Sequence, residues 1–320
     1  MQVPEIQSKA GRPKHVQIIL AHSRGCDYLY AMFNLKTYLS GKTGIIEAAL
    51  DAEMPPRGAQ PAILHTAMRY SVFSGGKRIR PILCLGAAEA VGGNSRNALL
   101  PAMAVELLHT YTLIHDDLPC MDDDDLRRGK PTCHVVFGEA NAILTGDALQ
   151  ALAFETLAKA KPPSRYPPNQ LMLELAHAAG SLGVVGGQVE DLAFDARHAK
   201  ANFMRFIHLH KTADLFRAAV RMGAIAGNAT KSELEALTEY GVNFGLAFQI
   251  ADDLLDATAA AKPGRRKAGE TNCVSVYGHA AARKKANAHV RKAMSALKHI
   301  RKGGAEPLIA VLRFAVDRAL

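Results

Sequence analysis

The chain has 320 residues, 48% of them hydrophobic, no tryptophan and a formal net charge of +9, which is enough sequence for one large core. The positive charge is spread along the chain without interleaved aromatic residues or a known binding module, so we expect no nucleic-acid partner. No apolar run reaches the ~18–20 residues of a membrane span, and five cysteines without a C-x-x-C pair favour a reduced, cytoplasmic setting.

The sequence predicts an all-α fold. Long stretches rich in alanine, leucine and methionine dominate, and alternating β-branched segments are few, which is typical of helices. Scattered glycines and prolines predict that residues 1–42 form an N-terminal extension of uncertain order. A single domain is expected over residues 43–320, with its first helix beginning at Ile45.

A basic turn, G-G-K-R-I-R-P, follows the second predicted helix at residues 75–81. Pro81 suits the first turn of the next helix, so Lys77 and Arg80 would stand near a helix N-terminus, where phosphate binds readily. The turn is not a P-loop, because no serine or threonine follows the lysine. A solvated basic turn is the alternative interpretation.

The next predicted helix, residues 98–118, carries several polar groups toward its end. His109 lies on the same face as Asp116, two turns or ~10 Å away. Tyr111 and Thr112 stand between them and would line whatever space extends from Asp116. A packed or surface histidine is the alternative to a ligand contact for His109.

An acidic cluster ends this helix, in the stretch L-I-H-D-D-L-P-C-M-D-D-D-D-L-R-R-G-K-P-T-C-H at residues 113–134. Six aspartates fall within residues 116–125, and Arg127 and Arg128 follow at once. Carboxylates this close repel one another unless they share a cation, and oxygen ligands suit Mg²⁺ or Mn²⁺ held together with a phosphorylated substrate. The arginine forks suit the phosphate. A solvated charged loop is the alternative.

Mid-chain polar groups stand among apolar neighbours. Lys211 lies inside the predicted helix of residues 200–227 and needs an anionic partner, because burying an ammonium group is costly. Thr212 follows it directly. Upstream, Gln188 and Asp191 share one helix face at positions i and i+3.

A second acidic cluster lies in F-G-L-A-F-Q-I-A-D-D-L-L-D, residues 244–256. At about 100° per residue, Asp252 and Asp256 lie on one helix face, with Gln249 beside them and Asp253 at its border. The apolar neighbours predict a largely buried helix, where three carboxylates would be costly without a metal or another cation. Two such clusters facing each other would hold several divalent ions and a diphosphate.

These motifs, in this order and with H-K-T between them, resemble those of the short-chain trans-prenyl diphosphate synthases, the family of farnesyl and geranylgeranyl diphosphate synthases. The resemblance covers about Ile45 to the C-terminus. It implies a single-domain helical bundle of the isoprenoid-synthase type around a central cavity, usually a homodimer. It also implies a Mg²⁺-dependent enzyme, with Mn²⁺ as the alternative metal, that joins isopentenyl diphosphate to an allylic diphosphate.

The resemblance assigns residues to four roles. The metal ligands would be Asp116, Asp117, Asp122, Asp252, Asp253 and Asp256. The contacts to the allylic diphosphate would be Arg127, Lys211 and Lys262, and those to isopentenyl diphosphate would be Lys77, Arg80, His109 and Arg128. The groups next to the reacting carbons would be Thr212 and Gln249.

The loop after Asp256 departs from the family pattern and is shorter. Lys262, Arg266 and Lys267 are therefore alternative contacts to the diphosphate there.

Product length would depend on Tyr111 and Thr112, five and four residues before Asp116. A bulky tyrosine at this position resembles the farnesyl-making members, so a product of fifteen carbons is expected. Geranylgeranyl diphosphate, with twenty carbons, is the alternative.

Two rival classes share this pattern. A class I terpene cyclase would use the same aspartates but would not need Lys77, Arg80 and Arg128, because it takes no second diphosphate. A non-catalytic partner subunit would be expected to have lost aspartates, and all six are present. Both remain alternatives to a synthase.

Overall fold

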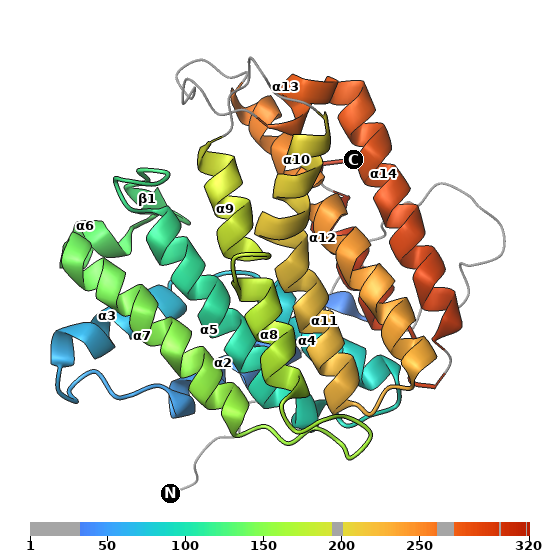
Figure 1. The fold of residues 1–320 in the computed structure, drawn as a ribbon, viewed down its shortest axis with the longest axis horizontal. Coiled ribbons are helices and arrows are strands. Elements are labelled where there is room, and N and C mark those ends of the chain that lie inside the picture. The colour runs from blue at the N-terminus through green and yellow to red at the C-terminus, as the bar shows by residue number, and fades with distance from the viewer. Residues whose placement is uncertain (1–32, 194–200, 261–271, 301, 318) are drawn as a thin grey trace, which may run out of the picture. The chain divides into compact units, whose positions relative to one another are not determined.

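The computed structural model describes residues 33–193, 201–260, 272–300, 302–317 and 319–320. Within the compact unit Asn34–Leu320, long helices run side by side (Figure 1). The all-α prediction is confirmed: the two short strands β1 and β2 are the only strands in the described part of the chain. None of the helices in the described ranges is both long and apolar enough to span a membrane.

The α-helices are α2 (Leu35–Glu53), α3 (Ala62–Val72), α4 (Ile79–Ala90), α5 (Leu99–Asp116), α6 (Cys133–Phe137), α7 (Glu139–Ala158), α8 (Gln170–Ala179), α9 (Val184–Leu192), α10 (Ala201–Ile207), α11 (Asp214–Ala226), α12 (Lys231–Ala260), α13 (Cys273–Tyr277), α14 (His279–Ala296) and α15 (Glu306–Val316). The shorter elements are the 3₁₀-helices η1 (Ser95–Ala98) and η4 (Leu297–His299), the π-helix η3 (His208–Ala213), and the strands β1 (Leu126–Arg127) and β2 (Lys130–Pro131).

The core forms where α4, α5, α11 and α12 meet. Helix α5 packs against α4 and α7, α11 packs against α4, α8 and α12, and α12 packs against α14. Leu83, Phe216 and Phe244 are fully buried there. Helices α4 and α11 approach closely at Gly223, where a β-carbon would overlap the carbonyl oxygen of Cys84. This packing fixes the end of α5 and the C-terminal half of α12, which carry the acidic motifs.

The first helix is longer than predicted. Helix α2 begins at Leu35 rather than at Ile45, because the Asn34 side chain caps it by accepting a hydrogen bond from the Thr37 N–H at 3.0 Å. Gly41 and Gly44 lie inside the helix and had indicated a break; each costs a helix only ~1 kcal/mol relative to alanine. The helix carrying the second acidic motif starts with a capping box, in which Thr230 and Glu233 exchange hydrogen bonds.

Candidate active site

The first acidic motif lies where α5 ends and the chain folds back on itself. Asp116 is the last residue of α5 and Asp117 caps it. The N–H of Asp122 donates to the Asp116 carbonyl oxygen at 2.8 Å, and the N–H of Asp124 donates to that of Asp117 at 3.2 Å. The backbone thus ties Asp122 to the helix end. Asp116 is half-buried and Asp122 is exposed.

Arg127 holds the second aspartate of this motif. Its Nε and Nη2 atoms lie 2.6 and 2.5 Å from Asp117 Oδ1, and Nη2 lies 3.6 Å from Asp124. Asp117 is buried. Burial raises the pKa of Asp117, against the opposing effect of Arg127. This carboxylate therefore fixes Arg127 next to the end of α5.

A two-residue hairpin turn presents Arg127 and its neighbour. Strands β1 and β2 pair antiparallel, with Arg127 opposite Lys130. Arg128 and Gly129 form the turn with φ of 55° and 76°, the combination that a type I′ turn requires. Arg128 donates from Nη1 to the Gly75 carbonyl oxygen. The hairpin therefore links the acidic motif to the basic turn.

Asp116 is electrostatically unusual. Burial raises its pKa to about 7; Lys211 and Arg127 oppose the rise, and Asp122 and Asp117 add to it. A carboxylate in this state gains from any further cation placed beside it.

Lys211 stands opposite the first acidic motif. Its Nζ donates to Asp191 Oδ2 at 2.5 Å. Burial acts to lower its pKa, but Asp191, Asp116 and Asp122 outweigh burial and raise it. The anionic partner that Lys211 was expected to need is therefore Asp191 of α9.

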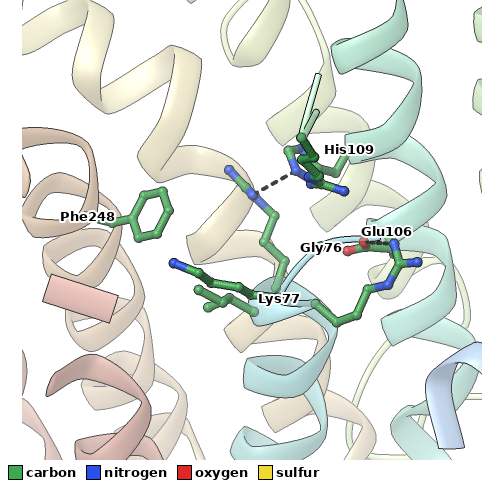
Figure 2. Close-up of a pocket in the computed structure, with 9 residues that line it drawn as sticks. Gly76, Lys77, Glu106, His109 and Phe248 are labelled. Atoms are coloured by element: carbon green, nitrogen blue, oxygen red, sulfur yellow. Dashed lines mark hydrogen bonds and ion pairs between the residues drawn. The ribbon is translucent and has the colours of Figure 1, made fainter. Parts of the chain in front are cut away.

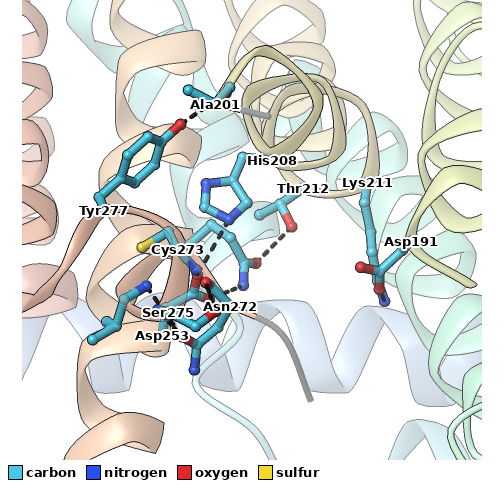
Figure 3. A network of polar contacts seen from close by, with 12 residues as sticks. Asp191, Ala201, His208, Lys211, Thr212, Asp253, Asn272, Cys273, Ser275 and Tyr277 are labelled. Atoms are coloured by element: carbon cyan, nitrogen blue, oxygen red, sulfur yellow. Dashed lines mark hydrogen bonds and ion pairs between the residues drawn. The ribbon is translucent and has the colours of Figure 1, made fainter. Parts of the chain in front are cut away.

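The second acidic motif contains a buried carboxylate with three polar neighbours, that of Asp253 (Figure 3). Asp253 is 6% exposed. Its Oδ1 accepts a hydrogen bond from Gln249 Nε2 at 2.9 Å, while Oδ2 accepts one from the Cys273 N–H at 2.8 Å and lies 3.2 Å from His208 Nε2. Burial acts to raise its pKa, but His208 and these hydrogen bonds lower it overall. Asp252 is half-buried and Asp256 is exposed.

The π-helix η3 separates the two acidic motifs. Lys211 and Thr212 are consecutive in it, yet Lys211 turns to Asp191 and Thr212 turns to α12 (Figure 3). The Thr212 hydroxyl donates to Gln249 Oε1 at 2.7 Å. Helix α9 lies tight against η3, since a β-carbon at Gly187 would overlap the Lys211 backbone. The structure thus brings Thr212 and Gln249 into contact, while Lys211, which precedes Thr212 in the chain, turns to Asp191.

A separate basic pocket of about 440 Å³ opens at the G-G-K-R-I-R-P turn (Figure 2). Lys77, Arg80, His109, Arg128 and Phe248 are among its lining residues. The pocket therefore brings together all four side chains that the resemblance assigned to isopentenyl diphosphate.

Arg80 and His109 organise the interior of this pocket. Arg80 donates from Nη1 to His109 Nε2 at 3.2 Å and stacks on the Phe216 ring at 4.2 Å. Burial lowers the pKa of Arg80 to about 10, against the effects of Glu106 and Asp252. Burial, reinforced by Arg80 and three other arginines, lowers the pKa of His109 well below its usual value. A neutral His109 thus serves as acceptor for Arg80 and leaves the pocket cationic.

Arg78 is a supporting residue that sequence reasoning missed. It is buried and adopts a left-handed backbone conformation with φ of 50°. Its guanidinium lies 2.7 Å from Glu106 and 3.2 Å from Glu47, and it donates to the Val72 carbonyl oxygen at 2.6 Å. Lys77 precedes Arg78 and Arg80 follows two residues later, so this ion pair anchors the turn that carries both. An isolated Glu106 in an apolar helix was the available signal.

Tyr111 and Thr112 face different parts of the site. Tyr111 is 8% exposed and its ring meets that of His115 edge to face, with centroids 5.4 Å apart. The Thr112 hydroxyl donates to the His109 carbonyl oxygen at 2.8 Å. At 1.5 Å per residue, Tyr111 lies ~7–8 Å along α5 from Asp116.

The donor set fits a magnesium ion that takes some ligands from the protein and others from a phosphorylated substrate. Asp116, Asp122, Asp252 and Asp256 offer oxygen atoms only, and Mg²⁺ usually combines one or two carboxylates with phosphate oxygens and water. In the described residues, no three acidic, histidine or cysteine side chains form a metal site by themselves. Lys262, Arg266 and Lys267 lie outside the described residues.

The fold and the site together define a helical-bundle protein. It has two acidic motifs, the segment η3, which carries Lys211, near both, and a separate basic pocket. A family model described as polyprenyl synthetase matches residues 61–302. The chain belongs to the polyprenyl synthetase family, as the sequence motifs had indicated.

Individual relatives agree with this assignment. Heterodimeric geranylgeranyl pyrophosphate synthase large subunit 1 (chloroplastic) of Arabidopsis thaliana is 46% identical over 244 residues, which are 74% of this chain and 65% of that protein, so the match spans about two thirds of its length. Geranylgeranyl pyrophosphate synthase (chloroplastic) of Capsicum annuum is 42% identical over 296 residues, which are 89% of this chain and 79% of that protein. The apo crystal structure of an FPP/GFPP synthase from Zymomonas mobilis has a TM-score of 0.77 and 38% identity, covering 88% of this chain and 99% of that chain.

Proposed function

We propose that this chain is a Mg²⁺-dependent prenyltransferase that condenses isopentenyl diphosphate with an allylic diphosphate. One observation supports the proposal: the molecule has two separate groups of cationic side chains, each suited to a diphosphate. Lys211 stands beside Asp116 and Asp122, whereas Arg80 and His109 line a different pocket. A reaction that joins two diphosphates needs two such sites.

The residues suit ionisation of an allylic diphosphate followed by alkylation. When the allylic C–O bond breaks, negative charge develops on the departing diphosphate, and Lys211 and Arg127 stabilise it from fixed positions. The Thr212 hydroxyl and the Gln249 amide present dipoles to the allylic cation without being carboxylates that it would alkylate. The double bond of isopentenyl diphosphate, anchored by Arg80 and Lys77, attacks the cation, and the released diphosphate accepts the proton that is then lost.

The proposed metal ligands are the four aspartates that project from the two motifs, Asp116, Asp122, Asp252 and Asp256. Bound magnesium would supply Lewis-acid stabilisation of the leaving diphosphate. Asp117 and Asp253 were also expected as ligands. Their oxygens accept hydrogen bonds from Arg127 and from Gln249 and Cys273, which favours a supporting role.

Two products are candidates. The geranylgeranyl names of the curated relatives support a product of twenty carbons better than the expected fifteen. The buried Tyr111, whose bulk below Asp116 resembles the farnesyl-making members, is the specific observation in favour of fifteen. We expect Tyr111→Ala to shift the product toward longer chains under either reading.

We propose that the chain assembles as a dimer through α6 to α9. Large apolar side chains are exposed on these helices: Val135, Val136, Ile143, Leu144, Met172, Leu173, Val185, Val189 and Leu192, with Leu182 in the preceding loop. Such a concentration of apolar surface is typical of an interface. The name of the Arabidopsis relative refers to a heterodimer, so light scattering of the purified chain alone tests whether it pairs with itself.

The cytoplasmic setting stays a prediction. Cys84, Cys120, Cys133 and Cys273 are free, which is usual in a reducing compartment, while the cited curated relatives carry chloroplastic names. Fractionation of the native cells tests it.

The decisive experiment supplies isotopically labelled isopentenyl diphosphate with dimethylallyl, geranyl or farnesyl diphosphate, with Mg²⁺ or with EDTA, and sizes the products. A synthase elongates only when both diphosphates and Mg²⁺ are present. A terpene cyclase would consume the allylic diphosphate without isopentenyl diphosphate. A non-catalytic subunit would do neither, and either result would refute the proposal.

A further inference from the structure

We propose that Asp253 is a positioning residue: it fixes the direction of the Gln249 amide and, through it, the direction of the Thr212 hydroxyl proton. This inference rests on the proposed function, because Thr212 takes part in the proposed prenyl transfer. It replaces the expectation that Asp253 binds a metal, and it gives His208 a role that the sequence did not suggest.

Burial and contacts occupy the Asp253 carboxylate. The residue is 6% exposed, and Oδ1 accepts a hydrogen bond from Gln249 at 2.9 Å. Oδ2 accepts one from the Cys273 N–H at 2.8 Å and lies 3.2 Å from Nε2 of His208, which is also buried. These partners come from α12, α13 and η3 and enclose the carboxylate within the bundle (Figure 3).

The contacts determine which way each dipole points. An ionised carboxylate only accepts hydrogen bonds, so the amide NH₂ of Gln249 must face Asp253. Its carbonyl oxygen then faces Thr212, at 2.7 Å from the hydroxyl oxygen. Because that carbonyl can only accept, the Thr212 hydroxyl must donate to it.

The consequence for Thr212 concerns its lone pairs. A hydroxyl has one proton and two acceptor positions. With the proton committed to Gln249, the oxygen can only present lone pairs to the space on its other side. That is the polarity that stabilises a developing carbocation, and it is set before the substrate arrives. Without Asp253 the amide can flip, and the hydroxyl proton loses its fixed direction.

The first acidic motif has the same arrangement of one buried and one less buried aspartate. Its second aspartate, Asp117, is also buried, accepts a hydrogen bond from Arg127 Nε and forms an ion pair with Arg127 Nη2. The first aspartates, Asp116 and Asp252, are half-buried. In both motifs, therefore, the second carboxylate points into the protein and orients another functional side chain.

A double-mutant cycle tests this chain of hydrogen bonds from Asp253 through Gln249 to Thr212, which we call the relay. Asp253→Asn is expected to lower kcat by about 100-fold, the lower end of the range for removing an oriented dipole in a water-excluded site, because Asp253 acts through Gln249 and Thr212. The Mg²⁺ concentration for half-maximal rate should stay within about twofold of the unaltered protein, because the relay contains no metal ligand. Adding Thr212→Val to Asp253→Asn should cost little more, since residues that act in one chain are not additive.

The matched control is Asp252→Asn, which alters the neighbouring carboxylate that we assign to the metal. It should raise the Mg²⁺ requirement more than about tenfold, a change of ~1.4 kcal/mol. An equal increase in Asp253→Asn would overturn the inference, and so would independent, additive losses from Asp253→Asn and Thr212→Val.

His208 provides a test that leaves both motifs intact. His208→Gln keeps an N–H donor near the position of Nε2, and His208→Leu removes it. If Asp253→Asn does not fold, the relay still predicts a lower kcat in the leucine variant, rescue in the glutamine variant, and an unchanged Mg²⁺ requirement in both. Equal activity of the two variants would refute it.

Calorimetry separates failure of the inference from failure of the proposed function. Geranyl thiolodiphosphate, an analogue that resists ionisation, should bind to Asp253→Asn with the Mg²⁺ dependence of the unaltered protein and to Asp252→Asn with a weakened one. If the unaltered protein shows no elongation, the proposed function fails. This binding comparison still decides whether Asp253 holds the metal.

Discussion

The two acidic motifs have the same local pattern, an adjacent pair of aspartates followed by a third, but they are built differently. The first motif lies at the end of α5, where the chain leaves the helix and returns through the β1–β2 hairpin. The second lies inside the long helix α12. In the first, Arg127 of the hairpin holds Asp117; in the second, neutral donors and His208 surround Asp253.

This difference shows how the bundle uses paired carboxylates. One member of each pair is buried and contacts a group from another element, which fixes the geometry of its neighbours. The other member stays closer to the surface of the site. Its charge raises the pKa of Lys211 in the first motif and opposes the lowered pKa of Arg80 in the second.

The largest expected effect separates the two carboxylates of the first motif. Asp116→Asn should reduce the elongation rate by on the order of 10²–10³-fold, since it removes charge where the leaving group is stabilised. The thermal midpoint without metal should rise by ~2–4 °C, because burial makes the Asp116 carboxylate costly to keep charged. Elongation assays and thermal unfolding at pH 8 check both. A lower midpoint would mean that Asp116 supports the fold.

Asp117→Asn should lower the stability of the protein, whereas Asp116→Asn should raise it. The Asp117 carboxylate accepts a charge-assisted hydrogen bond from Arg127 Nε and pairs with Arg127 Nη2, so losing the charge should destabilise the protein by ~1.5–3 kcal/mol. Asp124→Asn is the matched control, because its contact to Arg127 is longer, at 3.6 Å, and should contribute less than ~1 kcal/mol. Urea unfolding measures both. Equal losses would contradict the difference in role.

Two variants, one at Arg80 and one at Lys211, test whether these cations bind different substrates. Arg80→Lys keeps the charge but loses the planar fork that contacts His109 and Phe216. Its KM for isopentenyl diphosphate should rise by about tenfold, or ~1.4 kcal/mol, with the KM for the allylic diphosphate unchanged. Lys211→Met should show the reverse preference. If both variants affect the same KM, the two sites are not separate.

The smallest effect concerns pH. Burial and nearby arginines lower the pKa of folded His109, whereas the unfolded chain takes up a proton near pH 6.5. As pH falls below 6.5, protonation therefore favours the unfolded state, and this costs at most ~1.4 kcal/mol for each pH unit. His109→Gln should lose less stability than the unaltered protein between pH 6.5 and 5.5. Parallel unfolding curves for the two proteins would contradict the neutral, buried histidine.

The sequence predicted the helical fold well and marked the residues of the candidate site, because both depend on local patterns. Apolar residues at helical spacing predicted the bundle, and carboxylates inside apolar segments marked Asp116 and Asp252. The pocket around Arg80 followed from a basic turn before a proline. These features can be recognised in short segments without knowing what packs against them.

The sequence could not predict which polar groups are partners across elements. Nothing local indicates that Arg78 pairs with Glu106, or that His208 contacts Asp253, because these residues are distant in the chain. The H-K-T segment was expected in an ordinary helix, but it forms a π-helix held against α9. The turn at Arg128 was also missed, since only the glycine after it is a typical hairpin residue.

The π-helix has one further consequence. Because Lys211 and Thr212 are neighbours on a single widened turn, any rotation of that turn moves the group that contacts the departing anion and the group that faces the carbon centre by a common amount. As charge separates during the reaction, Lys211 at the departing diphosphate and Thr212 at the carbocation would therefore move together on one rigid piece of backbone. A residue inserted into or deleted from η3 should therefore impair both contacts together.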